Sequence, residues 1–188
     1  GGCYGSTGPF SINPETGKRY GSSFPNIAFR DIVESQVRLL DKLGIDTLLA
    51  VAGGSLGGMC VTDFAVRYPE RARVVIPIAS GLRATALTKC FNIEQVFAIV
   101  EDANFRGGDY YDGEYPWRGL CLARMISHKS FISLQTMERR AKDVIVQPDD
   151  LLGEYHLQHK IESYILHQGK KFVARFDPNS YLLIINAW

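Results

Sequence analysis

The sequence lacks several features that mark whole classes of protein. No apolar run approaches the roughly 20 residues that a membrane-spanning helix needs, so we expect no membrane association. The two signs of charge nearly balance, and a net charge of +1 gives no electrostatic reason to expect a nucleic-acid partner. The cysteines, Cys3, Cys60, Cys90 and Cys121, are scattered without C-x-x-C spacing. We therefore expect free thiols, a reducing and cytoplasmic location, and no bound metal.

The chain also has no initiating methionine, and it stops at Trp188 directly after the apolar stretch 181–185. Both ends look cut, so we expect a fragment of a longer protein. Its 188 residues are still enough for one domain with a sizeable core.

The most informative segment is Gly53-Gly54-Ser55-Leu56-Gly57. It follows an apolar run at 47–52 that is typical of a buried strand, and it precedes a helical pattern over 58–68. This strand, turn and helix context is what a G-x-S-x-G nucleophile elbow requires. We expect a side chain at Gly53 or Gly57 to collide with the neighbouring strand or helix. A glycine-rich packing turn and a phosphate-cradling loop are the alternatives for the same letters.

The pattern around this segment predicts an α/β fold. A helix is expected over 27–43 and a second strand over 73–79, which makes the order helix, strand, helix, strand and indicates a parallel sheet. Residues 85–180 contain no convincing strand. Helices are expected at about 87–101, 118–141 and 155–174, with Gly169 a weak point in the last. We therefore predict a partial core over 1–84 that begins with a long loop, a helical lid over 85–180, and a return to the core over 181–188.

Seven groups of residues, running in order along the chain, resemble the homoserine O-acetyltransferase family, the acyltransferases with the α/β-hydrolase fold. They include Gly1-Gly2-Cys3-Tyr4-Gly5-Ser6-Thr7-Gly8-Pro9, Gly53-Gly54-Ser55-Leu56-Gly57-Gly58-Met59, Ala65-Val66-Arg67-Tyr68-Pro69, Gly107-Gly108-Asp109-Tyr110-Tyr111, Ala123-Arg124-Met125-Ile126, Glu162-Ser163-Tyr164, and Phe176-Asp177 with Asn179-Ser180-Tyr181-Leu182. The resemblance implies an α/β-hydrolase fold with a helical lid insertion.

The resemblance also implies a ping-pong reaction on the way to methionine. Ser55 would be the nucleophile that takes an acetyl group from acetyl-CoA, a co-substrate, with no bound cofactor and no metal. The backbone N–H of Leu56 would be one donor of the oxyanion hole. Arg124 matches a lid arginine associated with substrate binding, where a guanidinium can hold the carboxylate of L-homoserine. Phe131 stands where many members have a tyrosine, so a hydroxyl is missing there.

The rest of a catalytic triad has no candidate in the chain. The histidines, His128, His156, His159 and His167, all fall in the predicted lid, where packed or solvent-facing roles are expected. Asp177 precedes the strand that should carry the family's catalytic acid. We therefore expect the acid and the base outside these 188 residues, and we expect the chain alone to be inactive.

Several alternatives remain open on the sequence. The first three are serine as the acceptor, succinyl-CoA as the donor, and an esterase that uses water. A binding protein that has lost its triad is a fourth possibility. The full-length protein is expected to be a homodimer through the lid, where exposed aromatic side chains could contribute or could line the entrance: Tyr110, Tyr111 and Trp117.

Overall fold

The computed structural model describes residues 2, 5–141, 145 and 152–187. The chain divides into two compact units. The sheet unit comprises Pro25–Ala86 with Leu183–Trp188, and the helical unit comprises Gly1–Phe24 with Leu87–Leu182. Among the described residues, no helix combines the length and the apolar character needed to cross a bilayer. The predicted division at residues 84 and 180 stays a prediction.

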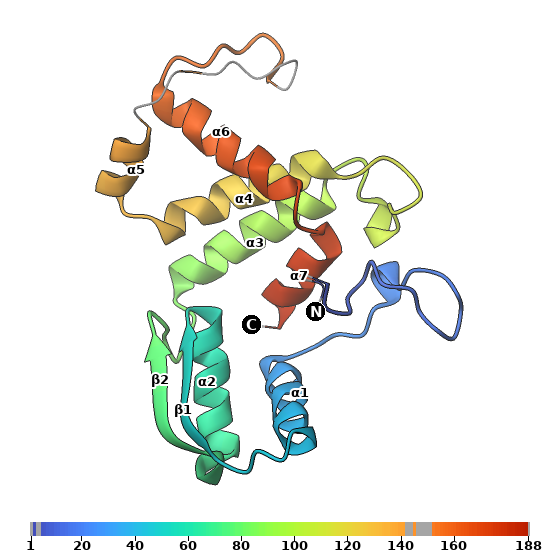
Figure 1. The fold of residues 1–188 in the computed structure, drawn as a ribbon. Coiled ribbons are helices and arrows are strands. Elements are labelled where there is room, and N and C mark those ends of the chain that lie inside the picture. The colour runs from blue at the N-terminus through green and yellow to red at the C-terminus, as the bar shows by residue number, and fades with distance from the viewer. Residues whose placement is uncertain (1, 3–4, 142–144, 146–151, 188) are drawn as a thin grey trace. The chain divides into compact units, whose positions relative to one another are not determined.

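The sheet unit has the predicted order of elements (Figure 1). Strands β1 and β2 are parallel neighbours, with Leu48 paired to Ala72 and Gly54 paired to Ile78. The predicted α/β pattern is therefore confirmed, with bounds that differ by a few residues. The elements of the sheet unit are α1 (Phe29–Lys42), β1 (Leu48–Gly54), α2 (Leu56–Arg67), the 3-10 turn η2 (Pro69–Arg71) and β2 (Ala72–Ile78).

A small apolar core joins α1 to α2. Val33 and Val37 of α1 are 0% and 5% exposed and pack with Cys60 and Phe64 of α2. Burial raises the pKa of the Cys60 thiol, as expected for a cysteine that packs in an apolar core. The helix predicted over 27–43 ends one residue early, because α1 ends at Lys42, and Leu43 just beyond it is 62% exposed.

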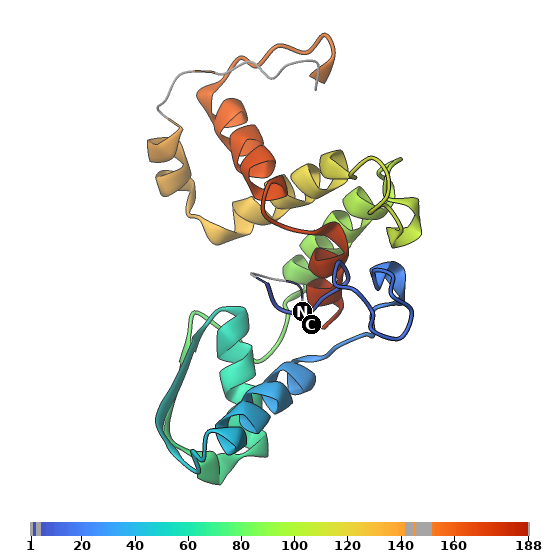
Figure 2. The same cartoon turned by 45° about the vertical axis from the view of Figure 1, so that its right-hand side comes forward.

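The helical unit is built from α-helices and turns (Figure 2). The predicted helix 118–141 is in fact two helices, because the chain turns at Ile132 and the Ser133 hydroxyl then accepts a hydrogen bond from the Thr136 N–H at 3.3 Å. The predicted helix from 155 begins only at Lys160. The elements of the helical unit are η1 (Gly21–Ser23), α3 (Ala86–Val100), η3 (Arg106–Gly108), α4 (Trp117–Phe131), α5 (Leu134–Arg140), α6 (Lys160–Val173) and α7 (Pro178–Asn186). The last of these helices, α7, continues past Leu182, the last residue of the unit.

Gly169 marks a close approach of α6 to α4. A Cβ atom on Gly169 would lie 2.6 Å from Cys121 Sγ and 2.9 Å from the Cys121 carbonyl oxygen. Both views show α6 lying against α4 (Figures 1 and 2). The interpretation of Gly169 as a weak point in the helix is therefore wrong, since its missing side chain is what allows the two backbones to approach.

A partly buried hydrogen-bond network joins the aromatic loop before α4 to the start of α7. Asp177 Oδ1 accepts from the hydroxyls of Tyr110 at 2.6 Å and Tyr111 at 3.1 Å. Asp177 Oδ2 accepts from the N–H and the hydroxyl of Ser180, both at 2.8 Å. Burial raises the pKa of Tyr110 far above its ordinary value, so its hydroxyl stays a donor. The expectation that Tyr110 is an exposed aromatic is wrong, because it is 1% exposed.

Candidate active site

Ser55 forms the turn between β1 and α2, with φ of 53° and ψ of −118°. A positive φ is uncommon outside glycine and stores strain of about 1–3 kcal/mol, so neighbouring groups must hold it. The Ser55 N–H donates to the Ile78 carbonyl oxygen on β2 at 2.9 Å, and the Ser55 carbonyl accepts from the Gly58 N–H at 2.9 Å. The strand, turn and helix context predicted for the nucleophile elbow is confirmed.

The glycines around this turn have unequal roles. A Cβ atom on Gly53 would lie 2.2 Å from the Gly57 carbonyl oxygen and 2.9 Å from Val61 Cγ2, as predicted. The same atom on Gly57 would meet nothing within 4 Å, so the predicted collision there is wrong. Gly58 is the second tight position, because its Cβ would lie 2.5 Å from Ser80 Cβ just after β2. Gly53 and Gly58 therefore allow α2 to begin close against the ends of both strands.

The environment of the Ser55 hydroxyl suits a nucleophile. Ser55 is exposed, and within the described part of the sheet unit no hydrogen bond reaches its Oγ. Leu56 is the first residue of α2, so its N–H has no acceptor within the helix and lies at the positive end of the helix dipole. An N–H in this place can donate to an oxyanion that forms on a carbonyl attacked by Ser55. The roles of Ser55 and Leu56 stay predictions.

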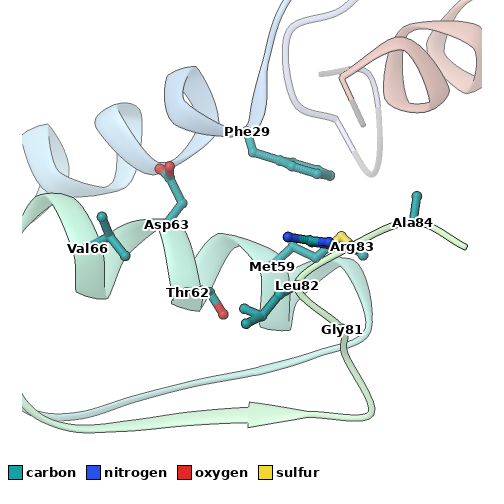
Figure 3. Close-up of a pocket in the computed structure, with 9 residues that line it drawn as sticks. All are labelled: Phe29, Met59, Thr62, Asp63, Val66, Gly81, Leu82, Arg83 and Ala84. Atoms are coloured by element: carbon teal, nitrogen blue, oxygen red, sulfur yellow. The ribbon is translucent and has the colours of Figure 1, made fainter.

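A cavity of about 360 Å³ opens beside the helix that follows Ser55. Figure 3 shows side chains from α1, from α2 and from the segment after β2 gathered around it. Phe29, Met59 and Leu82 supply apolar surface, while Thr62, Asp63 and Arg83 supply polar groups. Met59 follows Ser55 by four residues, so the cavity lies along the face of α2 that leads away from the turn.

Arg124 lies in the helical unit, near the middle of α4, and is half-buried. Its guanidinium carbon is 4.9 Å from the centre of the Phe172 ring and 5.3 Å from that of Phe131. Burial lowers its pKa, and the nearby Arg175 lowers it further. Among the described residues, no carboxylate lies within ion-pair distance of Arg124. A half-buried guanidinium without a carboxylate partner is a candidate anion site, and its substrate role stays a prediction.

The histidines are placed as packed or solvent-facing residues of the helical unit. His128 is 7% exposed, and its Nε2 lies 3.1 Å from the Tyr164 hydroxyl on α6. Burial lowers the pKa of His128, and the charges of Arg124 and Arg140 lower it further. The other histidines, His156, His159 and His167, are exposed. The expectation that the catalytic acid and base lie outside the chain stays a prediction.

The acidic residues near the aromatic loop have structural partners. Asp102 Oδ2 accepts from the Gly119 N–H at 2.7 Å, and Asp109 Oδ1 accepts from the Ser22 hydroxyl at 3.1 Å. Over the described ranges, no group of three or more histidine, cysteine, aspartate and glutamate residues could hold a metal ion.

Two features of the candidate site were not predicted from sequence. Phe172 contacts the Arg124 guanidinium from another helix, 48 positions along the chain, and no local pattern connects the two residues. Phe131 lies seven residues after Arg124, which is two helical turns, so a shared helix face was a detectable signal. The structure places the aromatic ring of Phe131 against the Arg124 guanidinium.

Known proteins resemble this chain over its whole length. The relatives include a homoserine O-succinyltransferase of Halorhodospira halophila, 49% identical over 100% of this chain and 49% of its own length. They also include a homoserine O-acetyltransferase of Solidesulfovibrio magneticus, 43% identical over 100% of this chain and 47% of its own length. The chain thus spans about half the length of the curated relatives it matches.

Solved structures of known proteins have a fold similar to that of this chain. The homoserine O-acetyltransferase of Bacillus anthracis matches with a TM-score of 0.84 and 28% identity, over 96% of this chain and 48% of that one. The esterase E22 matches with a TM-score of 0.83 and 30% identity, over 96% of this chain and 50% of that one. The predicted resemblance to homoserine acyltransferases is confirmed. The sequence pattern of the alpha/beta hydrolase fold matches residues 1–185, and the chain belongs to that family.

Proposed function

We propose that the protein carrying this chain is an acyltransferase that moves an acetyl group from acetyl-CoA to the side-chain hydroxyl of L-homoserine, a step of methionine biosynthesis. The backbone of Ser55 is the observation that carries the proposal. At φ of 53° a glycine would relieve the strain, so a serine there is best explained by a need for its hydroxyl. The similarity to proteins named homoserine acyltransferases supports the choice of reaction.

In the first half of the proposed reaction, Ser55 Oγ attacks the thioester carbonyl carbon of acetyl-CoA. A general base, expected outside these 188 residues, takes the hydroxyl proton. The Leu56 N–H donates to the oxyanion of the tetrahedral intermediate. The carbon–sulfur bond then breaks, the proton passes to the sulfur, CoA leaves as a thiol, and the acetyl group remains on Ser55 as an ester.

In the second half, the side-chain hydroxyl of L-homoserine attacks the acetyl ester of Ser55. Its proton passes to the base and then to Ser55 Oγ as the ester bond to the enzyme breaks, which releases O-acetyl-L-homoserine. Arg124 holds the carboxylate of the acceptor by charge-assisted hydrogen bonds. The half-buried guanidinium without an ion-pair partner among the described residues supports this assignment.

Two further candidates have specific support. A relative at 49% identity is named a homoserine O-succinyltransferase, so succinyl-CoA is the second donor to test. The similarity to an esterase makes water the second acceptor to test. The deciding experiment gives the protein acetyl-CoA or succinyl-CoA together with L-homoserine, L-serine or no acceptor, and follows CoA release. The proposal requires sustained release with acetyl-CoA and homoserine only, while sustained release without an acceptor would make the protein a hydrolase.

We further propose a cytoplasmic location and a homodimer for this enzyme. The location follows from the biosynthetic role of the proposed reaction and from cysteines that are free where they are described: Cys60, Cys90 and Cys121. Mass measurement of the purified protein in solution tests the homodimer, which a mass of one chain would exclude.

A further inference from the structure

The guanidinium of Arg124 lies against two aromatic rings in the helical unit. Phe131 comes from the last turn of α4, and its ring centre is 5.3 Å from the guanidinium carbon. Phe172 comes from α6, and its ring centre is 4.9 Å away. Both distances are within the range of a cation–π contact.

The Phe172 ring is fixed by its own neighbours. It is 6% exposed, it stacks on Phe176 with ring centres 4.8 Å apart and planes at 18°, and it meets Tyr181 edge-on at 5.7 Å. The carbonyl oxygen of Phe176 in turn accepts a hydrogen bond from the Tyr115 hydroxyl at 2.5 Å. Phe172 is therefore a rigid support for the guanidinium, whereas Phe131, at 65% exposed, lies on the surface.

The hydrogen-bonding capacity of Arg124 is not used by the protein groups described. Its Nε is buried and has no hydrogen-bond partner among the described residues. Aromatic contacts stabilise the positive charge but cannot accept the N–H groups, which point outward in the guanidinium plane. A planar carboxylate matches this arrangement because its two oxygens can accept two parallel N–H bonds.

We propose that Phe131 and Phe172 are positioning residues that hold the Arg124 guanidinium for the carboxylate of the acceptor amino acid. This proposal rests on the proposed function and extends it to the acceptor side of the site. Phe131 acts through its ring, so no hydroxyl is required at this position. Any aromatic side chain at this position supports acceptor binding, and an aliphatic one does not.

The test uses Phe131 because its exposure makes a folding failure avoidable, whereas Phe172 is a core residue. Phe131→Leu should raise the KM for L-homoserine about fivefold, the effect of losing one cation–π contact, and should change kcat little. Phe131→Tyr should restore the KM of the natural protein. Leu134→Ala is the matched control. Leu134 follows Phe131 by three residues and is 72% exposed, so this variant also removes exposed apolar surface, and it should have no effect.

A spectroscopic measurement tests the contact without any turnover. The Nε–H resonance of Arg124, identified by its loss in Arg124→Lys, should move in Phe131→Leu because the ring current is removed, and should stay near its natural position in Phe131→Tyr. Arg118, whose guanidinium lies over Trp117 at 5.5 Å, supplies a control resonance that neither variant should move.

Failure of this proposal is distinguishable from failure of the proposed function. Acetylation of Ser55 by acetyl-CoA alone does not involve the acceptor, so its absence in the natural protein would overturn the proposed function, while the Arg124 resonance would still report the ring contact. If Ser55 is acetylated but Phe131→Leu leaves the KM for homoserine unchanged, or if the Arg124 resonance does not move, the positioning role of Phe131 is overturned.

Discussion

Gly53 and Gly57 approach so closely that a Cβ atom on Gly53 would lie 2.2 Å from the carbonyl oxygen of Gly57. The contact is between the end of β1 and the first turn of α2, on either side of Ser55. Because the obstacle is backbone rather than a side chain that could turn away, any residue larger than glycine at position 53 must displace the strand or the helix.

Gly53→Ala should therefore lower the free energy of unfolding by about 3 kcal/mol. Gly57→Ala is the matched control, because its Cβ would meet nothing within 4 Å. It should be neutral or stabilise the helix by up to about 1 kcal/mol. Urea denaturation of both variants checks the difference, and equal effects would contradict the assigned geometry.

The strain at Ser55 gives a second prediction. Ser55→Gly should raise the free energy of unfolding by about 1 kcal/mol, because glycine adopts φ of 53° at little cost. Ser55→Ala keeps a Cβ atom and hence the strain, so it should change stability less while removing the hydroxyl just as completely. A glycine variant no more stable than the alanine variant would show that the turn is relaxed.

Asp177 should be among the most important polar residues of the helical unit. Asp177→Ala removes the acceptor of the Tyr110 and Tyr111 hydroxyls and of Ser180, and should cost about 3 kcal/mol because Tyr110 and Ser180 are buried. Asp112→Ala, a change at an exposed aspartate of the loop that carries Tyr110 and Tyr111, should change stability by less than about 0.5 kcal/mol. Thermal denaturation compares the two, and similar small losses would contradict the network.

His128 predicts a pH dependence of stability. Burial lowers its pKa in the folded state, so the unfolded chain binds more protons just below the ordinary value of about 6.5. Its contribution is fully present above that pH and is lost as the pH falls toward the lowered pKa. The groups that face it include Arg124 and Arg140, which add to the shift, and Tyr164, which contacts its Nε2.

Denaturation above and below about pH 6.5 checks this sign. His128→Gln should flatten the dependence across that window, whereas His167→Gln, a change at an exposed histidine of α6, should leave it in place. A stability that rises as the pH falls through the window would mean that His128 is stabilised in its charged form.

The elements around Ser55 were predictable because each depends on its own residues: an apolar run for β1, glycines for the turn, and a helical pattern for α2. The break between α4 and α5 was not predicted, since the helical pattern continues across Ile132 and Ser133. Which glycine is indispensable was predicted only for Gly53. A Cβ atom on Gly57 would meet nothing within 4 Å, whereas at Gly58 the answer depends on where Ser80 lies, and that is a property of the fold rather than of the local sequence.

The candidate site was also predictable only in part. Ser55 was identified by the residues beside it and Arg124 by resemblance, but the contact of Phe172 with Arg124 depends on how α4 and α6 cross. That crossing in turn depends on the close approach at Gly169, a position that the helical pattern alone indicated as a defect.

The role of Ser55 is tested most directly by the mass of the protein after a brief reaction with acetyl-CoA, followed by peptide mapping and then by addition of L-homoserine. We expect one added acetyl group on the peptide that contains Ser55, its loss when homoserine is added, the appearance of O-acetyl-L-homoserine, and no added mass in Ser55→Ala. An acetyl group on any other residue, or an unmodified protein that still converts homoserine, would contradict the assignment of Ser55 as the nucleophile.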